Sequence, residues 1–192
     1  MVGLALLGVP IIRLIYEHGR FTEHATQQTA HALTGYAVGL AAYSAVKVVA
    51  PAYYALGRTR IPLAGSMIAV GANLLWNVAT FRWLGHFGLA LGTSIAATMN
   101  LLVLVSSFQW QVKGLLSREF FLALARIVGA SVVMGVAVWF LSGRLELMPA
   151  HGLTARFLKA IVPCGVGAAV YFLTARVLGL EEAQTLVRRL RR

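Results

Sequence analysis

Long apolar runs alternate with short polar segments along the whole chain. A membrane-spanning helix needs about 20 mostly apolar residues, because the hydrocarbon core is about 30 Å thick and a helix rises about 1.5 Å per residue. Runs near this length predict spans at residues 1–17, 29–52, 62–84, 87–110, 122–143 and 157–180. The pattern therefore predicts an all-α, polytopic membrane helix bundle with about six transmembrane helices.

The first run differs from the others because it is short and interrupted. It contains Pro10, and Arg13 lies about one turn from its end. The chain begins inside this hydrophobic segment, and neither a basic stretch before it nor a small-residue cleavage site after it marks a signal peptide. We expect the run to be the tail of a longer helix, so that the sequence is a fragment or has a late start codon.

Composition supports a protein solvated by lipid. Apolar residues make up 59% of the chain and charged residues 12%, and the mean hydropathy is +0.76. A soluble domain carries about 25% charged residues. The net charge of +11 comes from basic residues scattered between apolar runs. This scatter favours orientation by anionic membrane lipids, and it argues against nucleic acid as a partner.

The connections between the predicted spans carry these basic residues unevenly. Alternate connections lie on the same side of the membrane. One side holds Arg58, Arg60, Lys113, Arg118 and the arginines of the tail, and the other holds Arg20, Arg82, Arg144, Arg156 and Lys159. Cytoplasmic loops carry an excess of Lys and Arg. The C-terminus and the turn at residues 57–60 are therefore expected in the cytoplasm.

Enzyme chemistry has little support in the sequence. The nucleophile-elbow, phosphate-loop, zinc-protease and CxxC motifs are missing, and the predicted spans hold no paired acidic residues. The histidines fall in predicted external connections or, for His31, at a span edge, as solvated histidines do. Cys164, the single cysteine, lies in an apolar run and is expected to act as a small apolar residue.

Polar residues inside the third and fourth predicted spans form the main candidate site. Asn73 and Asn77 are four residues apart and share a helix face. Asn77 and Thr93 are equally far from Gly85, so a hairpin centred there would bring them to the same depth. Their oxygens could clamp the two helices by hydrogen bonds, or could bind a hard cation. We favour the clamp, because such interhelical bonds are common.

Three further residues are candidates for lining a substrate cavity, namely Lys47, Tyr53 and Asn100. Lys47 lies about one turn inside the cytoplasmic end of the second span. A lysine there can extend its ammonium group to the headgroups, or it can face an anionic substrate in a cavity. Tyr53 also fits the aromatic belt at the membrane surface. The sequence does not decide between anchoring and a cavity role for Lys47, or between the aromatic belt and a cavity role for Tyr53.

Three linked segments resemble the MviN/MurJ lipid II flippase family. They read PIIRLIYEHGRFT, KVVAPAYYALGRTRIP and GLALGTSIAATMN, and their order and loop lengths also agree with that family. The resemblance covers essentially the whole chain. It corresponds to the C-terminal part of a full-length member, from the end of the ninth helix to the fourteenth.

The resemblance implies a two-lobed transporter of the multidrug/oligosaccharidyl-lipid/polysaccharide exporter type. Residues 1–111 would then be the second half of the C-lobe, residues 112–180 the two groove helices, and residues 181–192 a basic cytoplasmic tail. The implied function is not enzymatic: it is translocation of lipid II, the undecaprenyl-linked peptidoglycan precursor, across the bacterial inner membrane. The missing N-terminal helices of the same protein would be its partners. The alternatives are export of drugs or other polyprenyl-linked glycans, and a scaffold subunit without transport.

The resemblance also implies where a coupling sodium ion would sit. In some members sodium lies between the equivalents of the third and fourth spans and an acidic residue of an earlier helix, which is not in this chain. Asn73, Asn77, the carbonyl of Leu89 and Thr93 fall at the sodium positions of the two spans. Asn77 stands where an aspartate has been seen, and the loss of that charge weakens a cation site. No other cofactor is implied.

Overall fold

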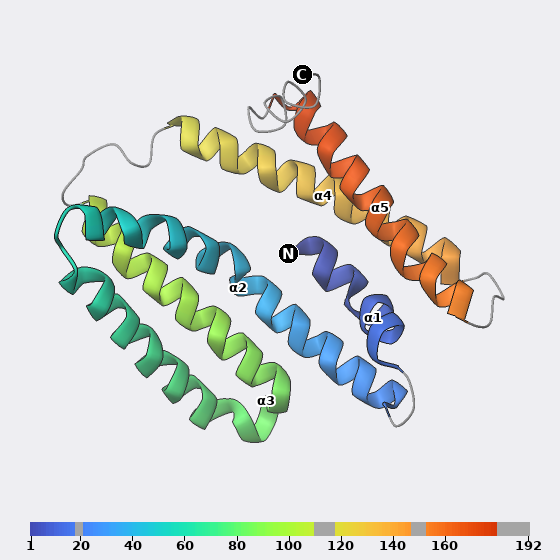
Figure 1. Ribbon diagram of the computed structural model, residues 1–192, viewed down its shortest axis with the longest axis horizontal. Coiled ribbons are helices and arrows are strands. Elements are labelled where there is room, and N and C mark those ends of the chain that lie inside the picture. The colour runs from blue at the N-terminus through green and yellow to red at the C-terminus, as the bar shows by residue number, and fades with distance from the viewer. Residues whose placement is uncertain (18–20, 110–117, 147–152, 180–192) are drawn as a thin grey trace. The chain divides into compact units, whose positions relative to one another are not determined.

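The computed structural model describes residues 1–17, 21–109, 118–146 and 153–179, and every regular element in these ranges is a helix. The helices are α1 (Val2–Tyr16), α2 (Glu23–Ala55), α3 (Arg60–Gln109), α4 (Arg118–Glu146) and α5 (Leu153–Val177) (Figure 1). Helices α2 to α5 are long and apolar enough to cross a membrane, while α1 is shorter. This confirms the all-α membrane class predicted from the apolar runs.

Helix α3 is a helical hairpin that reverses at Gly85 (Figure 1). Gly85 has φ 50° and ψ −133°, a conformation outside the helical region that glycine adopts without a steric penalty. Across the hairpin, the indole N–H of Trp76 donates a hydrogen bond to the carbonyl of Gly88 at 3.1 Å. The two arms, residues 60–84 and 86–109, correspond to the third and fourth predicted spans.

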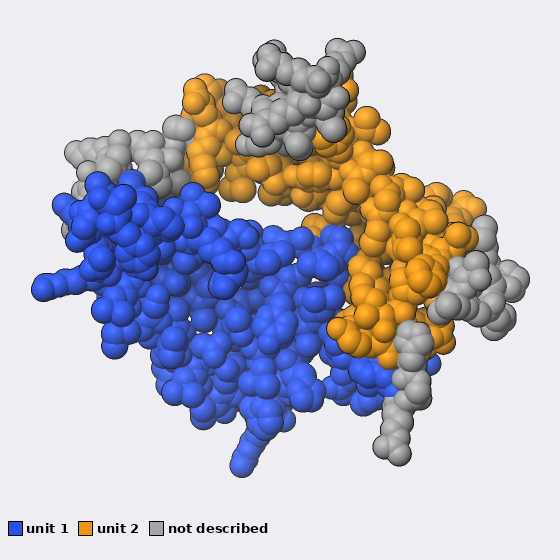
Figure 2. Space-filling model, viewed as in Figure 1, with its two compact units in different colours: residues 1, 3–5, 21–115 blue, residues 2, 6–20, 116–192 orange. Residues whose placement is uncertain are grey.

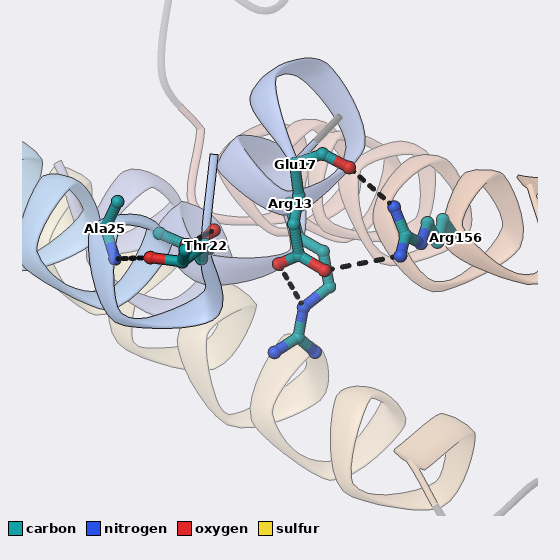
Figure 3. Close-up of polar contacts among 6 residues, drawn as sticks. Arg13, Glu17, Thr22, Ala25 and Arg156 are labelled. Carbon is teal, nitrogen blue, oxygen red and sulfur yellow. Dashed lines mark hydrogen bonds and ion pairs between the residues drawn. The ribbon is translucent and has the colours of Figure 1, made fainter. Parts of the chain in front are cut away.

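Helix α2 begins earlier than the predicted span of 29–52, because a polar side chain caps it. Thr22 has an extended backbone, and its hydroxyl oxygen accepts a hydrogen bond from the backbone N–H of Ala25 at 3.3 Å (Figure 3). Such a cap satisfies a helix N–H group that otherwise has no partner. His24, which we expected in a connection, therefore lies in the first turn of α2 and is exposed.

The chain forms two compact units (Figure 2). Unit 1 contains residues 1, 3–5 and 21–115, and unit 2 contains residues 2, 6–20 and 116–192. Helices α2 and α3 make up most of unit 1, and most of α1 belongs with α4 and α5 in unit 2. The assignment of these parts to a C-lobe and to groove helices stays a prediction.

Unit 1 is held by a close approach of α2 and α3 at small residues. A Cβ atom added to Gly35 would lie 2.9 Å from the Cβ of Ala90, and one added to Gly39 would lie 2.5 Å from the Cα of Ser94. Both distances are too short for a real side chain. The glycines, four residues apart on α2, thus let the two backbones touch, as small residues do between membrane helices.

Unit 2 packs α4 against α5 with α1 beside them. A Cβ atom on Gly167 of α5 would lie 2.8 Å from a methyl group of Val138 on α4. A Cβ atom on Gly135 of α4 would lie 2.8 Å from a methyl group of Val2 on α1. On both α4 and α5, a valine side chain of a neighbouring helix therefore packs against a glycine, in space that a larger residue would fill.

Large apolar side chains stay exposed on both units. Trp83 is 87% exposed and Val48 is 75% exposed in unit 1, and Trp139 is 68% exposed in unit 2. In water a surface of this kind would associate with other apolar surfaces. In a bilayer it is the surface that lipid tails solvate.

Candidate functional site

The two asparagines of the first arm of α3 bond to each other. The side-chain amide N–H of Asn77 donates to the side-chain oxygen of Asn73 at 2.8 Å, and both residues are half-buried. The side-chain oxygen of Asn77 is buried and has no hydrogen-bond partner among the described residues. This oxygen lies against Gly92 of the second arm, at a place that a side chain on Gly92 would occupy.

Thr93 and Leu89 form a second pair on the other arm. The Thr93 hydroxyl donates to the backbone carbonyl of Leu89 at 3.2 Å, one helical turn earlier. Thr93 is exposed and faces a groove between α2 and α3. The hairpin therefore brings Asn77 against Gly92, the residue next to Thr93. The hydrogen bonds of the candidate site join Asn77 to Asn73 on one arm and Thr93 to Leu89 on the other, and do not cross between the arms.

These four residues by themselves fit a packing role better than a sodium site. A hard cation prefers several oxygen ligands, usually with carboxylates among them. The set contains no carboxylate. Its one buried oxygen without a hydrogen bond among the described residues is that of Asn77. The Asn73 oxygen and the Leu89 carbonyl already accept hydrogen bonds. The sodium interpretation stays a prediction.

Ser94 joins α2 to α3, and the sequence analysis did not identify it as a site residue. Its side chain is buried, donates to the carbonyl of Gly35 at 2.5 Å and accepts from the N–H of Gly39 at 2.9 Å. In a regular helix the N–H of Gly39 would bond directly to the carbonyl of Gly35. The Ser94 hydroxyl therefore sits at the backbone of α2 and ties it to α3.

One signal in the sequence could have indicated this contact. Gly35 and Gly39 are four residues apart on α2, and Ala90 and Ser94 have the same spacing on α3. Two small-residue pairs of equal spacing are what a close helix crossing requires. The sequence shows the spacing but not which face of α2 meets which arm of α3.

A groove of about 290 Å³ adjoins this crossing. Its lining residues come from α2 and from the second arm of α3: Tyr36, Gly39, Leu40, Tyr43, Thr93, Ser94 and Ala97. The hydroxyl-bearing residues of the lining are the two tyrosines, Thr93 and Ser94, and the walls are mostly apolar. Such a groove suits an apolar chain better than a charged group.

Lys47 lies one turn beyond this groove and is exposed. Its ammonium nitrogen is 4.6 Å from the centre of the Tyr43 ring, within the range of a cation–π contact. Since Tyr43 lines the groove, the positive charge is held near one of its walls. The geometry leaves both the anchoring and the cavity interpretation of Lys47 as predictions.

Tyr53 and Asn100 pack within unit 1. Tyr53 is fully buried, its hydroxyl donates to the carbonyl of Leu104 at 2.7 Å, and its ring meets Phe108 edge to face at 5.5 Å. Asn100 is half-buried, and its side-chain oxygen lies 2.6 Å from where a Cβ atom on Gly65 would be. These contacts join α2 and the two arms of α3. A role of either residue in a cavity stays a prediction.

Several sequence predictions fall outside the described residues. They concern His18, Arg20, Lys113, His151 and the basic tail at 181–192.

Long apolar helices that join through small residues and buried hydroxyl groups define a multi-pass helical membrane protein. Comparison with known proteins gives the family. The family model described as "Lipid II flippase MurJ" matches residues 1–162. The chain therefore belongs to the MurJ lipid II flippase family, which is a family of transporters and not of enzymes. This confirms the resemblance seen in the sequence.

Curated relatives named "Probable lipid II flippase MurJ" are similar to this chain along most of its length. The protein of Vibrio cholerae is 31% identical over 183 residues, which cover 94% of this chain and 34% of the relative. The protein of Rickettsia prowazekii is 32% identical over 177 residues, covering 92% and 35%. The chain thus spans about a third of the length of the curated relatives it matches.

A solved structure has the same fold. It is titled "Lipid II flippase MurJ, inward closed conformation" and is 26% identical in sequence, with a TM-score of 0.75. The match covers 100% of this chain and 36% of the solved chain. The fold of this chain is therefore similar to that of a segment of the solved protein.

Proposed function

We propose that this chain is the C-terminal part of a lipid II flippase, which moves the undecaprenyl-linked peptidoglycan precursor across the bacterial inner membrane. The observation that carries the proposal is the match of the whole chain, at a TM-score of 0.75, to a solved lipid II flippase. The family match over residues 1–162 supports it independently. Further helices of the same protein would complete the transporter, since the relatives are longer than this chain.

We infer six membrane crossings from the helices. Helices α2, α4 and α5 supply one each, the two arms of α3 supply two, and α1 supplies the end of another. With the C-terminus in the cytoplasm, the turn at residues 57–60 is also cytoplasmic and Gly85 is external. The connections on the side that holds Arg58, Arg60 and the tail carry the excess of basic residues, and this excess supports a cytoplasmic location for that side.

Unit 1 has the contacts expected of a body that moves as one piece during alternating access. Ser94 joins α3 to the backbone of α2 near the middle of α2. Tyr53 joins the two helices again near the cytoplasmic end, through the carbonyl of Leu104. Two buried links at different heights resist both sliding and splaying of the helices. We propose that transport moves unit 1 without separating α2 from α3.

Lys47 is the residue of this chain that we propose to face an anionic substrate. Its charge is held beside Tyr43 at the edge of the groove, inside the cytoplasmic end of α2. A lipid carrying phosphate groups would be attracted to such a charge. The groove itself is mostly apolar and would suit part of a polyprenyl chain.

Growth of a flippase-depleted strain tests this proposal. The natural full-length protein is expressed as wild type, Lys47→Ala, Lys47→Arg and, as a control, Arg82→Ala, whose side chain is exposed at the opposite end of the hairpin. The wild type and the control should restore growth. Lys47→Ala should restore it poorly and Lys47→Arg better, at equal expression. Full growth with Lys47→Ala would leave Lys47 only an anchoring role, and no growth with the wild type would contradict the flippase function.

A further inference from the structure

A contact between Glu17 and Arg156 joins the end of α1 to the start of α5 within unit 2. Nη1 of Arg156 donates to the backbone carbonyl of Glu17 at 2.9 Å, and Nη2 lies 3.3 Å from a carboxylate oxygen of Glu17 (Figure 3). Glu17 directly follows α1, and Arg156 lies in the first turn of α5. One guanidinium group of α5 therefore binds both the backbone and the side chain of the residue that ends α1.

The backbone part of this contact caps α1. The last carbonyl groups of a helix have no donor within the helix, and the C-terminal end of a helix carries a partial negative charge. Arg156 supplies both a hydrogen-bond donor and a positive charge at this end. Because Arg156 belongs to α5, a neighbouring helix provides the cap of α1.

The carboxylate part makes the contact ionic. Nε of Arg13, one turn earlier on α1, lies 3.1 Å from the other carboxylate oxygen of Glu17 (Figure 3). This second pair lies within α1, so it orients the carboxylate, whereas Arg156 makes the connection to α5. The side chain of Glu17 is 17% exposed and that of Arg156 is 37% exposed. Since solvent reaches the guanidinium, dissolved salt should weaken the pair.

A contact of a different kind holds the beginning of α1. There, a methyl group of Val2 and one of Leu6 lie beside Gly135 of α4. The beginning of α1 is thus packed by apolar groups against α4, and its end is bound by polar groups to α5. Loss of charge or added salt can therefore release the end of α1 while its beginning stays in place.

We propose that Glu17 and Arg156 form an ionic latch between α1 and α5, and that the latch is closed in this structure. Helix α1 is followed along the chain by α2, a helix of unit 1. The latch makes the start of α5 follow the end of α1, the last helix before the chain continues into unit 1. A use of this coupling in transport rests on the proposed function, but the latch itself does not.

Spin labels on the purified full-length protein test the latch. Labels at Ile15→Cys and Val166→Cys, in a background that lacks other cysteines and includes Cys164→Ala, report the distance between the end of α1 and α5. Labels at Val128→Cys and Val166→Cys report the distance between α4 and α5. All three labelled positions are exposed.

The variants to compare are Arg156→Gln, Glu17→Gln and the two together. The matched control is Arg176→Gln, which removes the charge of an exposed arginine in the last turn of the same helix. Each variant is measured at low and at high salt, because an ionic contact is screened and an apolar one is not.

Arg156→Gln should broaden the distribution of Ile15–Val166 distances and shift it to longer values, because both hydrogen bonds of the latch are lost. Glu17→Gln should broaden it less, since the bond to the backbone carbonyl remains. The double variant should match Arg156→Gln alone, as expected of two residues that act through one contact. High salt should broaden the wild-type distribution and leave that of Arg156→Gln unchanged. Arg176→Gln should behave as the wild type does.

A wild-type distribution in Arg156→Gln would overturn the proposal, as would equal broadening in Arg176→Gln or additive effects in the double variant. Broadening of the Val128–Val166 distances would also overturn it, because Arg156 would then sustain the packing of unit 2 as a whole. The measurement needs no transport, so failure of the latch and failure of the flippase function give different results.

Discussion

The Ser94 hydroxyl accepts a hydrogen bond from the backbone N–H of Gly39 at 2.9 Å and donates one to the carbonyl of Gly35 at 2.5 Å. One side chain of α3 thus forms hydrogen bonds with both the N–H and the carbonyl group that face each other across a turn of α2. Because Gly39 has no side chain, Ser94 can reach that backbone at all. The crossing of α2 and α3 depends on both residues.

Substitution of Gly39 should therefore destabilise unit 1 more than substitution of Ser94. In Gly39→Ala the new methyl group meets the backbone of Ser94, and overpacking of this kind costs about 1–3 kcal/mol. Ser94→Ala removes a buried hydroxyl, but the N–H of Gly39 and the carbonyl of Gly35 remain hydrogen-bond partners for each other within α2, so the cost should be about 0.6 kcal/mol. Thermal unfolding of the full-length protein measures both.

Gly71→Ala is the matched control for this prediction. Gly71 is also inside a membrane helix, but nothing lies within 4 Å of an added Cβ atom. Its replacement should leave the melting temperature unchanged or raise it slightly, since alanine favours a helix over glycine. Equal destabilisation by Gly39→Ala and Gly71→Ala would show that the close crossing does not determine stability.

Tyr53→Phe should destabilise the same unit at its other link. The change removes the hydrogen bond from the Tyr53 hydroxyl to the carbonyl of Leu104 but keeps the ring against Phe108. Buried hydrogen bonds contribute about 0.5–1.5 kcal/mol net, so a loss of that size is expected. Tyr54→Phe is the control, because Tyr54 is 55% exposed. If both variants unfold at the wild-type temperature, the hydroxyl of Tyr53 does not hold α2 to α3.

The asparagine pair on α3 predicts how the protein responds to sodium. The wild type should melt at the same temperature in sodium and potassium salts, since Asn77 supplies a single unengaged amide oxygen. Asn77→Asp should gain a sodium-specific stabilisation, because it adds a charged oxygen ligand. A sodium-specific shift in the wild type would contradict the clamp interpretation. If neither protein responds, the cation hypothesis for this cluster is wrong.

The orientation of the helices can be tested with single cysteines. In a Cys164→Ala background, Thr59→Cys should be protected from an impermeant thiol reagent in intact cells, and His24→Cys should react. His24 is preferred to Thr22 because Thr22 caps α2. Both positions are exposed in the structure, so the difference would report the membrane side. Labelling at Thr59 without labelling at His24 would reverse the proposed topology.

Much of the fold could be predicted from the sequence because lipid imposes a simple rule. A spanning segment must satisfy its own backbone and be long and apolar. The six apolar runs accordingly correspond to α1, α2, the arms of α3, α4 and α5. Hydropathy predicts the start of α2 too late, because it does not register the cap made by Thr22.

The site could be predicted less well, because its contacts depend on which helix faces meet. Equal distance from Gly85 placed Asn77 at the depth of Thr93, but rotation of the second arm presents Gly92 to it. Spacing on one helix cannot reveal that rotation. The ion pair of Glu17 with Arg156 joins residues 139 apart, a separation at which no local pattern operates.

The flippase function itself is tested most directly by the membrane side on which lipid II accumulates. A bacterial strain depleted of its own flippase is supplied with the full-length natural protein or with an empty vector. The exposed lipid II is then measured in spheroplasts with an externally added enzyme that degrades it. Our account predicts that the added enzyme degrades lipid II when the full-length protein is present. With the empty vector, lipid II should stay on the cytoplasmic side and be protected from the enzyme. Lipid II that stays inaccessible, although the protein is present in the inner membrane, would contradict the account.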